Sequence, residues 1–142
     1  MTQEEKEILI QDLCARLPYG VKVQTTYINP KTKARSDIGI DVLSPTEISL
    51  LIDGYEEHKP YLFPLSSMTE EQYNTLRELG ILDNCSHSYE YVNSHIYGIS
   101  FIFKQFKTYS LELIKWLNKN HFDYRGLIPM GLAIDCTNLN IY

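Results

Sequence analysis

The chain has 142 residues, of which 44% are hydrophobic and 22% charged, so it can bury a core of its own, and we expect a single domain over residues 1–142. Its net charge of -5 provides no general cationic field, so we expect no general nucleic-acid binding. The three cysteines include no C-x-x-C pair, which indicates reduced thiols and argues against a disulfide framework.

The N-terminal residues and the hydropathy pattern indicate the compartment. Glu4 and Glu5 are acidic where a secretory signal would be basic, and no apolar run approaches the roughly 18 residues that span a bilayer. We therefore expect a soluble protein in the cytoplasm, without a membrane partner. The basic cluster at Lys31, Lys33 and Arg35 is typical of a solvated turn.

The first predicted elements are a helix and a strand. Residues 2–17 place apolar side chains at near-helical spacing, with Thr2 as the N-cap and Glu5 as its capping-box partner. The period changes to two over residues 19–28, which predicts a strand that ends in a turn at residues 29–33. One face of this strand carries Val21, Val23, Thr25 and Tyr27.

Two more strands are predicted from alternating apolar residues. They are Ile38, Ile40 and Val42 in the second strand and Ile48, Leu50 and Ile52 in the third. Residues 59–65 carry two prolines, each of which removes a ladder donor, so we expect an edge strand or an extended return segment there. Because the short strands follow directly on one another, we expect a three- to four-stranded antiparallel meander, packed on the first helix or curled into a small barrel.

Two further helices and one ambiguous segment complete the chain. Thr69 and Gln72 form the capping box of one helix. Residues 99–103 alternate like a strand, although one buried helical turn fits the same pattern. Thr108 or Ser110 caps a last amphipathic helix, which is followed by an irregular C-terminal segment. The predicted fold class is therefore α+β.

Residues 121–132 read His-Phe-Asp-Tyr-Arg-Gly-Leu-Ile-Pro-Met-Gly-Leu and hold the densest group of reactive side chains. One interpretation is structural: Asp123 caps a short turn, and Arg125 pairs with Asp123 or Asp135 at the surface. The apolar residues of the segment then fill the core, and its two glycines permit tight backbone geometry. These apolar residues are Leu127, Ile128, Met130 and Leu132.

The alternative interpretation is a ligand-binding site made of His121, Asp123, Tyr124 and Arg125. Tyr124 would stack on a ligand, Arg125 would hold a phosphate or carboxylate, and the other two side chains would add polar contacts. A hydrolase or nuclease with His121 as base and Asp123 as its orienting group is a further alternative. The spacing marks neither a nucleophile nor a metal pair, so we assign no catalytic residue, no metal and no cofactor.

A C-terminal segment carries a family resemblance. Residues 116–133, W-L-N-K-N-H-F-D-Y-R-G-L-I-P-M-G-L-A, are similar to the segment W-L-N-x-x-x-F-D-Y-R-G-L-I-x-x-G-L-A of an uncharacterised small protein family of phages and mobile elements of Bacteroides-type gut bacteria. Residues 13–21 and 59–71 resemble the same family. The resemblance implies a phage or mobile-element origin and a bacterial host cytosol. It carries no site residues over to this chain.

These observations lead to one functional hypothesis and two alternatives. We expect a non-enzymatic binding protein whose partner is a small anionic, nucleotide-like ligand or a host protein, with an anti-defence role by sequestration. The hydrolase or nuclease with His121 and Asp123 is the first alternative. The second is an interaction module of a virion or replication complex, forming a homo-oligomer, because tyrosine, at 11 residues, is frequent and suits interfaces.

Overall fold

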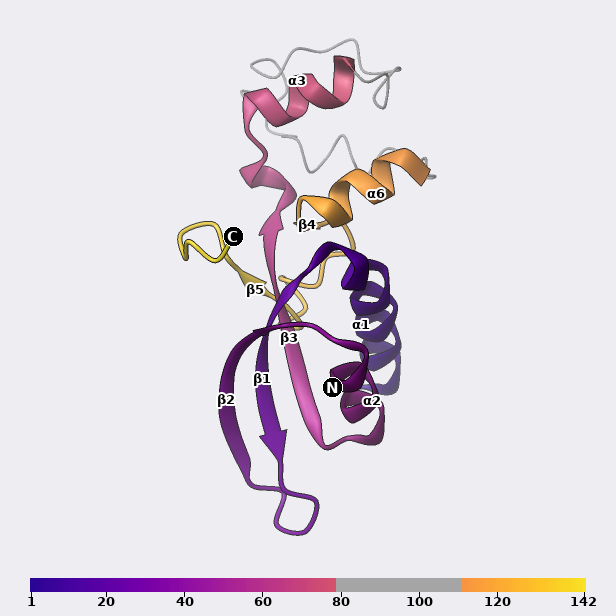
Figure 1. Cartoon of the computed structure of the whole chain (residues 1–142), viewed down its shortest axis with the longest axis vertical. Coiled ribbons are helices and arrows are strands. Elements are labelled where there is room, and N and C mark those ends of the chain that lie inside the picture. Colours follow the sequence, from indigo (N-terminus) through magenta and orange to yellow (C-terminus); the bar gives the residue numbers. More distant parts are fainter. Residues whose placement is uncertain (79–110) are drawn as a thin grey trace. The chain divides into compact units, whose positions relative to one another are not determined.

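The computed structural model describes residues 1–78 and 111–142, and the elements of these residues are labelled in Figure 1. The predicted strand at residues 99–103 lies outside the described residues, as do the predicted caps Thr108 and Ser110. No helix in the described ranges is long and apolar enough to cross a lipid bilayer.

The chain leaves one folded unit and later returns to it. Residues 1–62 and 125–142 form unit 1, and residues 63–124 form unit 2. The described residues of each unit contain their own buried apolar cluster. The single domain expected from the sequence stays a prediction.

Helix α1, Gln3–Arg16, begins where the sequence predicts it. The Glu5 amide donates to the Thr2 hydroxyl at 3.1 Å, and the Thr2 amide donates to the Glu5 carboxylate at 2.6 Å. This reciprocal pair satisfies amides that the first helical turn cannot pair internally. Leu9 and Leu13, one turn apart, are buried. The predicted capping box is confirmed.

Strands β1, Lys22–Ile28, and β2, Arg35–Val42, form an antiparallel hairpin. The side-chain oxygen of Asn29 accepts from the amides of Lys31 and Thr32, which closes the predicted turn. The apolar residues of β2 do not enter the core. Ile38, Ile40 and Val42 are all exposed, because β2 is the outer strand of the hairpin.

The third strand predicted from Ile48, Leu50 and Ile52 is wrong, because Pro45–Asp53 form helix α2. Ser44 and Glu47 build a capping box, and Gly54 ends the helix in the left-handed region at φ +78°. Proline at the first helical position suits this start because its missing amide is not needed there. The apolar residues of this segment also fit the spacing of one helix face, on which Ile48 and Leu51 are buried.

Strand β3, Glu56–Pro64, lies between other strands and is not the predicted edge strand or return segment. Residues 56–60 pair antiparallel with β1, and residues 61–62 pair parallel with the short strand β5, Ile134–Asp135. Pro60 stands where one ladder ends and the next begins, so its missing amide interrupts neither ladder.

The α+β class is confirmed, whereas the strand arrangement is not a simple antiparallel meander. Helix α2 separates β2 from β3, and β3 then returns beside β1, which gives the order β2-β1-β3. The parallel pairing of β3 with β5 makes the strand pairing of unit 1 mixed. A chain-order meander would have required direct hairpin connections between all the strands.

Both helices of unit 1 pack on the same face of its strands (Figure 1). The cluster between them excludes water and supplies the main hydrophobic stabilisation of this unit. Its members are Leu9, Leu13, Val21, Val23, Leu43, Ile48, Leu51, Leu62, Leu127, Leu132 and Ala133.

Unit 2 contains the two further helices that the sequence predicts. Helix α3, Glu70–Glu78, begins with the expected Thr69 and Gln72 capping box, with bonds of 2.9 and 3.2 Å. Helix α6, Leu111–Lys119, packs its apolar side near strand β4, Phe122–Asp123. The buried cluster of this unit consists of Leu65, Met68, Tyr73, Leu76, Leu113, Leu117 and Phe122.

The C-terminal residues form hydrogen bonds with both β1 and β3 within unit 1. The Tyr142 hydroxyl accepts from the Lys22 amide at 3.0 Å and donates to the Tyr61 carbonyl at 2.9 Å. The Lys22 ammonium also donates to the Ile141 carbonyl at 2.6 Å. Burial raises the pKa of Tyr142 to about 12, so the phenol keeps the proton that it donates.

We expect Tyr142→Phe to lower the free energy of unfolding by about 1 to 2 kcal/mol, because the Lys22 amide and the Tyr61 carbonyl lose a shared partner. Urea denaturation would measure this loss. Tyr55→Phe is the matched control, since the Tyr55 side chain is exposed and no hydrogen bond of its hydroxyl is seen among the described residues. Equal losses of stability for the two substitutions would show that the Tyr142 hydrogen bonds do not stabilise unit 1.

Candidate functional site

Three of the four residues assigned to a ligand site belong to unit 2. His121 has a backbone φ of +60°, and its carbonyl accepts from the Phe63 amide at 2.9 Å. Asp123 is only 7% exposed within β4, and Tyr124 packs against the buried cluster of the unit. Backbone pairing and burial therefore hold this part of the segment.

Arg125 belongs to unit 1 and contacts a carboxylate that sequence reasoning did not name. Its Nε lies 3.3 Å from Oδ1 of Asp12, which is fully buried on α1. Arg16, also fully buried, holds the same carboxylate with Nε and Nη2 at 2.6 and 3.1 Å. Two guanidinium groups thus converge on Asp12. A fork geometry of this kind gives the strong, charge-assisted form of hydrogen bond.

The rest of the segment follows the structural interpretation in part. Leu127 and Leu132 are buried in the cluster of unit 1, and Gly126 and Gly131 adopt positive φ angles of +78° and +73°. Met130, expected in the core, is 39% exposed. It lines a pocket instead, and this pocket is the better candidate site.

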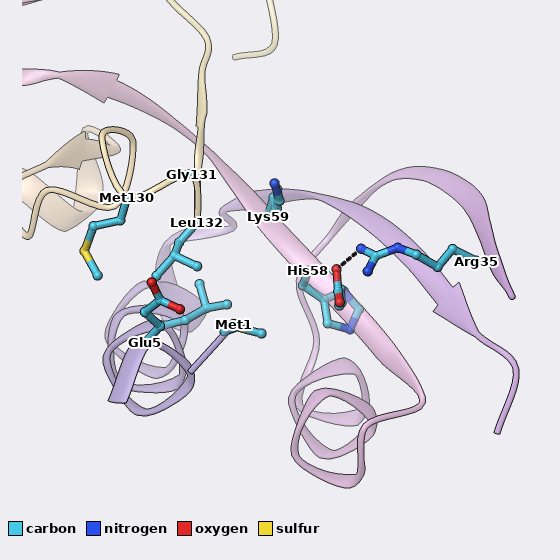
Figure 2. Close-up of a pocket in the computed structure, with 10 residues that line it drawn as sticks. Met1, Glu5, Arg35, His58, Lys59, Met130, Gly131 and Leu132 are labelled. Atoms are coloured by element: carbon cyan, nitrogen blue, oxygen red, sulfur yellow. Dashed lines mark hydrogen bonds and ion pairs between the residues drawn. The ribbon is translucent and has the colours of Figure 1, made fainter. Parts of the chain in front are cut away.

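The pocket has a volume of about 340 Å³ and lies beside β3, between the start of α1 and the loop at residues 130–132 (Figure 2). This volume lies at the lower end of the range of small-molecule sites. Apolar side chains line one part and charged side chains another. The lining residues are Met1, Glu5, Leu9, Arg35, Glu57, His58, Lys59, Met130, Gly131 and Leu132.

Most of the charged side chains that line this pocket already interact with another group of the protein. Arg35 pairs with Glu57, and the dashed line in Figure 2 marks this ion pair. Glu5 accepts from the Thr2 amide in the capping box, where the positive end of the helix dipole favours a carboxylate. Lys59 has no ion-pair partner among the residues that the structure describes. Among the side chains that line the pocket, Lys59 is therefore the cation whose charge is available to a ligand.

Lys59 also borders a second hollow, of about 390 Å³, on the polar face of the strands. The two hollows share Arg35, Glu57 and Lys59, so these side chains stand between them. The remaining lining residues of the second hollow are Gln24, Thr26 and Asp37. Because the lysine stem is long and flexible, its ammonium can serve a ligand on either side.

His58 belongs to a row of three polar side chains with Thr25 and Glu56, and of these three only His58 lines the pocket. His58 Nδ1 lies 3.0 Å from the Thr25 hydroxyl, and Nε2 lies 3.1 Å from a carboxylate oxygen of Glu56. When Nε2 carries the proton, Nδ1 accepts from the Thr25 hydroxyl, while the contact of Nε2 with Glu56 does not have the geometry of a hydrogen bond. Figure 2 shows His58 and Lys59 on opposite sides of β3, as the strand period requires.

The environment of His58 favours the neutral ring. Burial lowers the pKa of His58 below its ordinary value of 6.5, and the carboxylates of Glu56 and Glu47 partly offset this effect. Sequence reasoning missed the row, because the predicted extended segment began at Lys59 and left His58 and Glu56 outside it. The alternation of Glu56, His58 and Pro60 was the signal that could have found it.

The two free cysteines of the described ranges differ in environment. Cys14 is exposed on α1, whereas Cys136 is buried. Burial, and then the nearby Asp135 carboxylate, raise the pKa of the Cys136 thiol to about 11. A thiol that stays protonated is a weak nucleophile, so Cys136 is not marked as a reactive cysteine.

We expect Asp12→Asn to destabilise unit 1 by about 3 to 5 kcal/mol, because the fully buried Arg16 would lose its counter-charge. Chemical denaturation would measure the change. Glu7→Gln, at an exposed position of the same helix, should change stability by about 0.5 kcal/mol at most. A loss below about 1 kcal/mol for Asp12→Asn would show that the carboxylate is dispensable for the fold.

The stability of the protein should also depend on pH through His58. Because the pKa of His58 is lowered on folding, the unfolded chain binds a proton first as the pH falls below about 6.5. The stabilising contribution of the neutral ring is thus complete above this pH and is lost towards the lower folded pKa. Urea midpoints across this window should fall more steeply for the wild type than for His58→Gln. Parallel curves would contradict the prediction.

The chain matches no protein-family model, no curated protein and no solved structure. The resemblance of residues 116–133 to phage and mobile-element proteins therefore stays a prediction. The pocket beside β3 is the structural feature from which a function can be argued.

Proposed function

We propose that this protein is a non-enzymatic binding protein that takes a small anionic ligand in the pocket beside β3. The observation that carries the proposal is the Lys59 ammonium. It has no ion-pair partner in the described part of the chain, while the neighbouring Arg35 and Glu57 neutralise each other. An exposed cation at the rim of a concave pocket can hold the anionic group of a ligand while the rest of the ligand fills the pocket.

The apolar lining indicates what else the ligand carries. Met1, Leu9, Met130 and Leu132 contribute apolar surface to the same pocket. A ligand with one anionic group and a compact apolar or aromatic body would match both parts. Methionine side chains are flexible and polarisable, so Met1 and Met130 can adapt to a planar ring or to an aliphatic chain. A mononucleotide and a short amphiphilic anion both fit this description.

The biological setting is proposed from the sequence. The resemblance of residues 116–133 supports a phage or mobile-element origin, and hence a role in the cytosol of a bacterial host. Sequestering a nucleotide-like signal of host defence would be one use of a site for small anions. The assignment of His121, Asp123, Tyr124 and Arg125 as ligand-binding residues stays a prediction, as do the hydrolase and interaction-module alternatives.

The proposal predicts that a simple anion with an apolar tail binds and that its neutral analogue does not. Hexanesulfonate and adenosine monophosphate are suitable probes, and hexanamide is the neutral comparison. Lys59→Ala should weaken hexanesulfonate binding about tenfold, because one charge-assisted hydrogen bond contributes roughly 1.5 kcal/mol. Isothermal titration calorimetry would measure the affinities.

Lys31→Ala is the matched control, since Lys31 is an exposed lysine of the hairpin turn and does not line the pocket. It should leave the affinity unchanged. If wild-type protein binds neither anionic probe, or if both lysine substitutions weaken binding equally, the pocket is not the anion site.

A further inference from the structure

The outer edge of β2 has no partner strand among the residues that the structure describes. The Leu43 amide donates to the Val21 carbonyl at 2.9 Å, so Leu43 and the residues two and four positions before it direct their main-chain groups toward β1. Ile40 and Val42 therefore direct theirs away from the sheet. The Val42 amide donates to the Asp41 carboxylate at 2.7 Å. The amide and carbonyl of Ile40 thus remain available to an incoming strand.

A bulge in the hairpin limits the length of this edge. Between Asp37 and Gly39, β2 carries one residue more than β1, and this extra residue is Ile38. A bulge disrupts the regular ladder, so the regular stretch of the outer edge covers residues 39–42, with Ile40 near its centre. An edge of this length suits a short extended segment.

A hollow of about 360 Å³ adjoins this edge and is bordered by β2 and helix α2. Ile38 and Ile40 line it with side chains that are 62% and 52% exposed, and Leu50 of α2 adds apolar surface. Among the described residues, the charged side chains that line it are all carboxylates, and they are Asp41, Glu47 and Glu56. A side chain with an apolar stem and a cationic head, as in lysine or arginine, matches both parts of this lining.

The contacts of these carboxylates leave their negative charge in place. Glu47 accepts from the Ser44 amide in the capping box, and Asp41 accepts from a neutral amide as well. Glu56 lies 3.1 Å from the ring of His58, whose pKa is lowered by burial, so the ring favours its neutral form. The hollow therefore favours a basic partner over an acidic one.

A second copy of this chain fits the edge poorly. Its β2 would bring Asp37 and Asp41 towards an acidic hollow, and the only basic residue of that strand, Arg35, is already paired with Glu57. Like charges brought together in this way oppose association.

We propose that the outer edge of β2 and the adjoining hollow bind an extended segment of another protein, whose main chain pairs with Ile40 and whose lysine or arginine enters the hollow. Strand addition of this kind takes its affinity from main-chain hydrogen bonds and its specificity from the pocket for alternate side chains. In the part of the chain that the structure describes, this hollow shares no lining residue with the pocket beside β3. The edge site is therefore independent of the anion site.

The probe is the acetylated and amidated peptide Thr-Val-Thr-Lys-Thr-Val-Thr, and the comparison peptide carries glutamate in place of lysine. Calorimetry should show binding of the lysine peptide, weakened at least about tenfold by glutamate because attraction becomes repulsion. Hydrogen exchange of the Ile40 amide, followed by NMR, should slow when the lysine peptide is bound. A lysine peptide that does not bind, or that binds without protecting this amide, would overturn the inference.

Asp41→Asn should weaken the lysine peptide about two- to fivefold, the effect of one partly exposed ion pair, while asparagine keeps an acceptor for the Val42 amide. Asp37→Asn is the matched control on the same strand. It keeps an acceptor for Thr26 and does not line the hollow, so the affinity should stay unchanged. Equal effects of the two substitutions would show that the hollow does not receive the lysine.

Ile40→Pro removes the outward amide but no hydrogen bond to β1, so it should abolish peptide binding. If this variant does not fold, N-methylated peptides decide: methylation of one alternate set of peptide amides should abolish binding, and methylation of the other set should not. Dimerisation of the wild type through β2 would show that a second copy occupies the edge and would overturn the inference. Lys59→Ala should leave peptide binding unchanged, so failure of the anion site and failure of the edge site are distinguishable.

Discussion

The buried carboxylate of Asp12 is the interaction on which the organisation of unit 1 depends. Arg16 on the same helix and Arg125 at the start of the returning segment both contact it. A lone buried charge would be costly, so the three groups stabilise the fold only together. With Arg125 fixed in this way, Leu127 and Leu132 enter the core, and the loop at residues 130–132 reaches the pocket.

Strand β3 carries polar side chains on both of its faces. Its alternation sends Glu57 and Lys59 to the polar face and Glu56 and His58 towards the helices. One short strand therefore supplies both the cation that would attract a ligand and the titratable ring behind it. The pairing of residues 56–60 with β1 fixes this geometry, because it places Thr25 directly opposite His58.

Sequence reasoning succeeded where the signal is local and failed where it depends on distant partners. The capping boxes at Thr2 and Thr69 identified two helix starts, because the bonding groups lie three residues apart. Between them, the Ser44 and Glu47 box begins helix α2 in a segment whose alternating apolar residues also fit a strand. The partner of Arg125 and the pocket around Lys59 could not be predicted, since they join residues from both ends of unit 1.

The chain leaves unit 1 after Leu62, forms unit 2 and returns to unit 1 at Arg125. Its first and last strands run side by side, with Phe63 paired with Phe122 and Pro64 with Asp123, so the points of departure and return are neighbours. A protein tolerates changes of length in an inserted segment whose two ends lie close together. Insertions or deletions between these two strands would therefore leave their pairing, and the return of the chain to unit 1, in place.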